Sequence, residues 1–296
     1  MKKILIALGA VIALIVGFKF YDIFMDKKAQ GEVEKFLSKT FRKTGDVQYT
    51  SVDYNPFTQE ITVEGIYYRA KSGESYRIGK VVIKEFSGTS ADFSLYDIEP
   101  LSSDEKFFLK KYGYETQKFN IEASYNILPE QNTFLIKKLR LDYPDAFSIT
   151  ISVEIGNYDH KFWKYYLQKK EITDKDSFEI LSEMGSLKLL SARFYYKDKG
   201  LKEKVLEVEA KEKGLSPEEF KNQLIKDLEK GRKFAKNEFD LQLYDAAIKF
   251  LKEGKEVIID IKPRKSVKFQ DIVFVVALRK DENALIKLLN PSVSVK

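Results

Sequence analysis

Apolar residues alternate with polar ones along much of this chain, and this period of two constrains the fold more than any other feature. The pattern is clearest after a turn at residues 55–58, in four apolar residues: Ile61, Val63, Ile66 and Tyr68. Successive side chains of a strand point to opposite faces, so the alternation predicts strands with one buried face. We expect a strand on each side of the turn and another from Tyr76 to Phe86.

A related pattern returns further along the chain. Tyr54-Asn55 corresponds to Tyr125-Asn126, and the four apolar residues above correspond to Phe134, Ile136, Leu139 and Leu141. The segments of about 45–86 and 118–156 therefore predict two β-meander repeats in one long antiparallel sheet. Chance similarity between two amphipathic hairpins explains the likeness equally well, because a period of two makes any pair of meanders look alike.

The segment 201–254 changes to helical spacing. Ser216-Pro217-Glu218-Glu219 combines an N-cap, a proline at the first helical position and a capping-box glutamate. Amphipathic helices here can cover one face of the sheet, which predicts an α+β domain over residues 45–296. We expect a strand at 187–196 before these helices, strands within 256–278 after them, and a short final helix around Ala284 to Leu289.

Residues 1–25 read as a signal anchor. Lys2 and Lys3 precede an uninterrupted apolar run from Ile4 to Phe18, and no small residues are well placed for cleavage. Fifteen apolar residues span only about 22 Å, so the predicted transmembrane helix needs Phe20 to Met25 to approach the ~30 Å hydrocarbon layer. The short head places the amino terminus inside, although the lysines that follow the run favour the reverse orientation.

The predicted anchor also has a face suited to self-association. Gly9, Ala13 and Gly17 are four residues apart, so a second helix could approach closely and form a homodimer. Frequent alanine and glycine in membrane helices account for the spacing as well. A Lys/Glu-rich juxtamembrane helix is expected at 26–44, where apolar residues recur at helical spacing.

A second candidate membrane contact lies after the second meander. Asp159 can cap a helix that contains Lys161, Phe162, Trp163 and Lys164, which could meet a membrane interface with lysines at head groups and aromatics at the acyl boundary. The competing interpretation, which we prefer, is that the aromatic side chains cover the sheet.

Composition narrows the chemistry. The chain has 51 Lys and Arg against 45 Asp and Glu, interspersed, which does not favour a nucleic-acid partner. There is no cysteine and one histidine, His160, which excludes thiol catalysis and zinc motifs that need several imidazoles. Ser103 and Lys106 have the spacing of a serine-lysine pair, but a capping box explains the serines better. Asp174 and Asp176 are interpreted as loop acids, so no cofactor and no metal is expected.

Three classes of function remain. The preferred hypothesis is a non-enzymatic protein of envelope assembly or maintenance that binds another envelope protein. The alternative is a domain that binds or transfers a lipid or other hydrophobic ligand, and a continuously apolar groove would favour it. A hydrolase of envelope glycans that relies on carboxylates is the least favoured; it stays open as an alternative because its paired acids can be distant in the chain.

A single N-terminal anchor followed by hairpins of the type Val52-Asp53-Tyr54-Asn55-Pro56-Phe57 through Ile61-Thr62-Val63-Glu64-Gly65-Ile66 resembles the AsmA-like group of bacterial envelope proteins. The resemblance covers the anchor and residues 45–160. It implies a role in envelope or lipid homeostasis without catalysis. We therefore expect a single-pass protein of the bacterial inner membrane with its α+β domain facing the periplasm.

Overall fold

The computed structural model of the protein describes residues 45–55, 58, 60–87, 89–101, 109–114, 118–169, 171–279 and 281–296. The predicted anchor at 1–25 and juxtamembrane helix at 26–44 lie outside these residues. None of the helices in the described ranges has the length and apolar character needed to cross a membrane.

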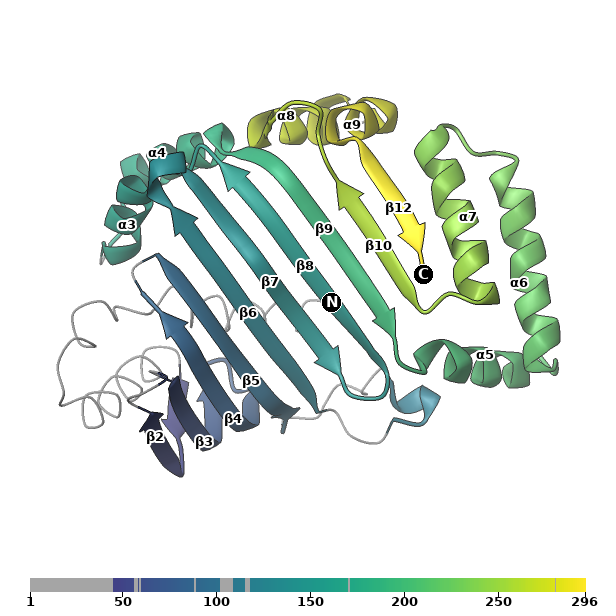
Figure 1. The fold of residues 1–296 in the computed structure, drawn as a ribbon, viewed down its shortest axis with the longest axis horizontal. Helices are drawn as coiled ribbons and strands as arrows, with labels where there is room; N and C mark the ends of the chain where they lie inside the picture. The colour runs from purple at the N-terminus through teal and green to yellow at the C-terminus, as the bar shows by residue number, and fades with distance from the viewer. Residues whose placement is uncertain are drawn as a thin grey trace.

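The described strands form one twelve-stranded antiparallel sheet that runs across the whole molecule (Figure 1). Its main path is β1-β3-β4-β5-β6-β7-β8-β9-β10-β12, while β2 pairs with β3 and β11 with β9. The strands are β1 (Gly45–Gln48), β2 (Ser51–Asn55), β3 (Glu60–Ala70), β4 (Ser75–Phe86), β5 (Ser90–Pro100), β6 (Phe119–Leu128), β7 (Thr133–Tyr143), β8 (Phe147–Gly156), β9 (Lys188–Asp198), β10 (Glu256–Ile261), β11 (Val267–Lys268) and β12 (Pro291–Val295). The predicted antiparallel meander is confirmed.

Strand β5, which joins the two predicted repeats, was not expected from the sequence. Its alternation breaks at Asp97, which has a positive φ of 54°, and β5 shifts register against β6 between Leu95 and Ile98. Strand β3 has Gly65 at φ 61°, also between two apolar residues spaced three apart. These irregularities restore apolar side chains to one face, as β-bulges do, but they interrupt the period of two.

The helices connect strands at the two ends of the sheet. They are α3 (His160–Gln168), α4 (Asp174–Ser186), α5 (Leu201–Glu212), α6 (Pro217–Arg232), α7 (Glu238–Lys252), α8 (Phe269–Phe274) and α9 (Glu282–Leu289), with short 3-10 turns η1 (Lys110–Tyr112) and η2 (Pro129–Gln131) and a π-helical turn η3 (Val275–Arg279). The capping box at Ser216 and Glu219 is present, and Asp159 accepts hydrogen bonds from the backbone N–H groups of Lys161 and Phe162. Both predicted helix starts are therefore confirmed.

Two predictions about local structure are wrong. Asp174 and Asp176 are not loop acids, because Thr173 and Asp176 form a capping box that begins α4. The expected strand over 267–278 is extended only at Val267–Lys268, since α8 and η3 follow. The backbone N–H of Phe269 donates to the carbonyl of Leu187, which turns the chain away from the sheet at that point.

The helical segment 201–254 packs on the sheet, as expected, but its contact is with the last strands. Helix α7 lies along β12 and β10 (Figure 1). Gln242 Oε1 accepts from the backbone N–H of Val293 at 3.3 Å, and Lys249 Nζ donates to the carbonyl of Val295 at 2.9 Å. The N–H and carbonyl groups of Val293 and Val295 face away from β10. The backbone hydrogen bonds between β12 and β10 are made by the residues that alternate with these two. Helix α7 thus caps the edge of the sheet and protects it from pairing with another strand.

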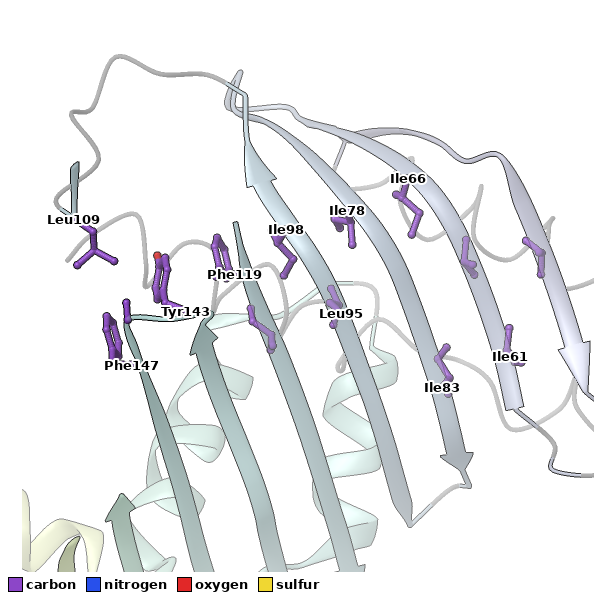
Figure 2. Packing of buried hydrophobic residues seen from close by; sticks show 14 residues of the cluster. Ile61, Ile66, Ile78, Ile83, Leu95, Ile98, Leu109, Phe119, Tyr143 and Phe147 are labelled. Carbon is purple, nitrogen blue, oxygen red and sulfur yellow. The ribbon is translucent and has the colours of Figure 1, made fainter. Parts of the chain in front are cut away.

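The main hydrophobic core lies on one face of the sheet, near the end where α5 begins. Figure 2 shows Ile66, Ile78, Ile98 and Phe119 projecting from the same side of neighbouring strands. A second, smaller core forms between the helices, from Leu206, Ala210 and Phe220 with Leu215, Leu224 and Leu251 packed against it. The helices therefore bury much of their apolar surface against one another.

Candidate apolar binding face

Two unbroken rows of apolar residues cross the sheet on one face, which we call the apolar face. Each row follows the strand register from β3 to β12, with every member opposite the next. The first row is Ile61, Ile83, Phe93, Ala123, Leu139, Ile151, Phe194, Ile259 and Val293; the second is Val63, Val81, Leu95, Ile121, Leu141, Ile149, Tyr196, Val257 and Val295. The first predicted repeat contributes Ile61 and Val63 to these rows, and the second contributes Leu139 and Leu141.

The opposite face is polar and is crossed by ion pairs between neighbouring strands. Arg193 of β9 forms a bidentate pair with Asp260 of β10, with N–O distances of 2.7 and 3.1 Å. Lys199 Nζ lies 2.7 Å from Asp142 Oδ1. Burial alone would raise the pKa of Asp142, but hydrogen bonds from Lys199 and Arg140 outweigh it and hold the pKa below its usual value. Parts of this face are buried, since Val82, Ser94 and Ser148 are at most 5% exposed. The apolar face has the greater need of a cover, because it has few charged side chains that water could solvate.

Cover over the apolar face is uneven. On the β3 side, Ile61 and Val63 are each only 2% exposed. From β7 to β10 every member of both rows is half-buried. The more extensive helix contacts with these strands are those of α7 with β12 and β10, and Phe250 of α7 packs on Tyr196 of β9 with ring centroids 5.8 Å apart. We call the half-buried region the open apolar surface, and it is represented by Leu139, Ile151, Val153, Phe194, Ile259 and Ile261.

An aromatic stack extends the apolar face at the end of the sheet occupied by α3, α4 and α8, which we call the α4 end (Figure 1). Phe134 of β7 stacks on Tyr158 at 5.3 Å, and Tyr158 stacks on Trp163 at 6.1 Å with rings 8° from parallel. Phe162 contacts both Trp163 and Tyr166. Burial raises the pKa of Tyr158 to about 12, as expected of a phenol in an apolar stack.

The residues proposed from the sequence for a membrane interface divide into two pairs. Phe162 and Trp163 are half-buried in the aromatic stack, whereas Lys161 and Lys164 are exposed on the outer side of α3. Gly9, Ala13 and Gly17, the candidate dimer face, lie outside the described residues. So do Ser103 and Lys106.

Sequence reasoning missed a cluster of exposed apolar side chains at the α4 end. Phe178, Leu181 and Met184 form one stripe along α4, with Phe178 75% exposed and Leu181 66% exposed. Val273, Phe274 and Val276 of α8 and η3 are exposed nearby. The capping box at Thr173 followed by apolar residues at spacing i, i+3, i+6 is the signal that could have identified the α4 stripe.

Polar chemistry on the apolar face is sparse. No group of three or more His, Asp or Glu side chains in the described ranges is placed to hold a metal ion. His160 begins α3, and burial together with Lys164 lowers its pKa. Its Nδ1 and the Nε1 of Trp163 are enclosed without a hydrogen-bond partner among described groups. The interaction available to a ligand on this face is therefore hydrophobic contact.

Comparison with known proteins places the chain in a family. A protein family model described as "Uncharacterized protein" matches residues 140–296, which hold β8 to β12 and helices α3 to α9. A protein of the same description from Aquifex aeolicus (strain VF5) is 43% identical over 296 residues, covering 100% of both chains. Neither match bears the AsmA-like description suggested by the hairpins. The chain therefore belongs to this family of uncharacterized proteins.

Proposed function

We propose that this protein is a non-catalytic, membrane-anchored envelope protein that binds the acyl chains of a lipid on its apolar face. One observation carries the proposal: two rows of apolar side chains continue across nine strands, and from β7 to β10 they are only half-buried. These side chains keep part of their apolar surface accessible in one continuous region, and contiguous accessible apolar surface is a feature of binding sites. The preference for a lipid over a protein partner differs from the first expectation from the sequence.

The dimensions of the open apolar surface fit acyl chains. A strand of ten residues such as β8 is about 33 Å long, and one leaflet of a bilayer has a hydrocarbon depth of roughly 15 Å. The surface is continuous both along and across the strands, so a chain can lie on it in more than one register. Each Å² of apolar area that the lipid covers contributes about 25 cal/mol, without any need for a specific polar partner.

The site of action rests on the N-terminal sequence. The predicted anchor at 1–25, with its lysine-bearing head, supports a location in the bacterial inner membrane with the described domain in the periplasm. The AsmA-like resemblance of the hairpins supports a role in envelope lipid homeostasis. Sparse polar chemistry on the apolar face supports binding rather than catalysis.

Photocrosslinking tests the proposal with a matched pair of adjacent residues. A photoreactive amino acid at Ile151 points to the open apolar surface, whereas one at Ser152 points to the polar face opposite Arg193. The full chain is irradiated in its native membrane, purified in detergent and analysed by mass spectrometry. We expect lipid adducts at position 151 and few at position 152.

Two outcomes would reject lipid binding. Equal lipid labelling at both positions would show contact without use of the apolar face. Adducts at position 151 only to another protein would instead favour an adaptor that binds an envelope protein, the function first expected from the sequence.

A further inference from the structure

Exposed apolar side chains in the described part of the chain are concentrated at the α4 end. Of the thirteen large apolar side chains that are exposed in the described part of the chain, eight belong to residues 165–184 and 273–276. Six of these, which we call the α4–α8 patch, are Phe178, Leu181, Met184, Val273, Phe274 and Val276. Their exposure ranges from 45% to 75%, so they protrude rather than fill gaps in the fold. A patch of this kind marks an interaction surface.

The two halves of the α4–α8 patch are joined by direct contact between their helices. A Cβ atom on Gly185 of α4 would lie 3.5 Å from Gln270 Cβ of α8, which is ordinary van der Waals contact. The backbone N–H of Phe269, the first residue of α8, donates to the carbonyl of Leu187 just after α4. The end of α4 and the start of α8 therefore form one local unit.

A basic segment adjoins this unit. Lys262, Arg264, Lys265 and Lys268 lie between β10 and α8, and all four are exposed. The seven residues from 262 to 268 contain no acid. Val267 and Lys268 pair with the first residues of β9, directly after α4, which holds the basic segment beside the α4–α8 patch. Exposed apolar side chains next to clustered cations are the composition of a surface that binds an anionic membrane.

We propose that the α4–α8 patch docks on a lipid bilayer, with its apolar side chains at the acyl boundary and the basic segment at anionic head groups. A second copy of the chain fits less well, because a symmetric contact would bring two basic segments together. Docking here brings the bilayer to the end of the sheet where the aromatic stack continues the apolar face. The inference does not require that face to hold a ligand, so docking and the proposed function can fail separately.

A fluorescent label tests docking without ambiguity, because the chain has no cysteine. Leu181→Cys places an environment-sensitive label on the α4–α8 patch. Leu243→Cys, on α7 and also exposed, is the matched control. The full chain is reconstituted in vesicles of phosphatidylcholine and phosphatidylglycerol with a spin-labelled quenching lipid. In one experiment the quencher is in the vesicles that hold the protein, and in a second experiment it is only in vesicles added afterwards. The comparison shows whether the patch docks on the protein's own bilayer or on another one.

We expect blue-shifted emission and quenching at position 181 in one of the two arrangements, with position 243 unaffected. Lys265→Gln and Lys268→Gln should each weaken docking on phosphatidylglycerol vesicles roughly fivefold and leave docking on neutral vesicles unchanged. Phe178→Glu should abolish the shift while the circular dichroism spectrum is retained, because that side chain lies outside the core. An unshifted label at position 181 in both arrangements, or equal shifts at positions 181 and 243, would overturn the proposal.

Discussion

Truncation of two isoleucines on the apolar face tests whether this face is rigidly covered near β3 and open near β8. Ile61 of β3 is 2% exposed within the main core, whereas Ile151 of β8 is half-buried. Both residues lie in the first apolar row, so the substitutions Ile61→Ala and Ile151→Ala remove the same atoms from the same kind of strand position.

The expected costs differ because only a rigid cover leaves a cavity. Three carbons at about 0.8 kcal/mol each, plus a cavity term, make Ile61→Ala cost about 3 to 4 kcal/mol. At Ile151, solvent or a fluid acyl chain fills the space, so the cavity term is absent. The side chain is also partly exposed, which reduces the loss of transfer free energy to about 1.5 to 2 kcal/mol. With a urea dependence near 3 kcal/mol/M, the midpoint of unfolding should fall by about 1 M for Ile61→Ala and about 0.6 M for Ile151→Ala.

Urea unfolding of the full chain, followed by circular dichroism, measures both midpoints against the parent protein. Equal shifts for the two variants would refute the reasoning. They would mean that another part of the protein packs rigidly on β8, and the proposal of an open apolar surface would then be withdrawn.

Three further predictions concern the edge, the acid stability of α4 and the orientation of the chain. Gln242→Ala should leave the backbone N–H of Val293 without its side-chain acceptor, costing about 1 kcal/mol, and should speed hydrogen exchange at Val293 relative to Ile258. Hydrogen bonds from Lys169 and Thr173 hold the pKa of Asp176 well below its usual range, so its stabilising effect is complete above the unfolded value of about 3.9 and is lost as pH falls below it. Acid titration should therefore destabilise the parent chain more steeply below about pH 4 than Asp176→Asn. A reporter fused after Lys296 that must be exported for activity should be active, and activity only of a cytoplasmic reporter would contradict the predicted orientation.

Sequence patterns predicted strands in which alternation continues on both sides of any break. β3, β7 and β9 were identified although each has two apolar residues spaced three apart. β5 was missed because Asp97 takes a positive φ and shifts the later apolar residues by one position. β12 has only Val293 and Val295 as alternating apolar residues, too few for a pattern.

The segment 269–279 shows tertiary structure overriding local preference. Its β-branched and aromatic residues favour a strand, yet α8 and η3 are helical. The pairing of β9 explains this. One edge of β9 pairs with β8, and the other edge pairs with β10 from Ala192 onward. Only the start of β9 is left for Val267 and Lys268 to pair with. Beyond them the chain packs against α4 instead. The α4–α8 patch follows from that change, which is why no local pattern in this segment predicted an exposed surface.

The open part of the apolar face depends on where the helices of 201–254 pack, and no local signal encodes that. Amphipathic spacing predicted that these helices would cover the sheet, and their stripes are indeed apolar. They satisfy much of that requirement among themselves, through Leu206, Ala210 and Phe220, and α7 is held at the edge by polar bonds to the backbone of β12. The open apolar surface and the α4–α8 patch then present the same energetic problem, since each would leave contiguous apolar area in water. In the two proposals, a lipid covers the open apolar surface and a bilayer covers the α4–α8 patch, and both remove apolar area from water. The predicted membrane anchor would keep the domain close to both.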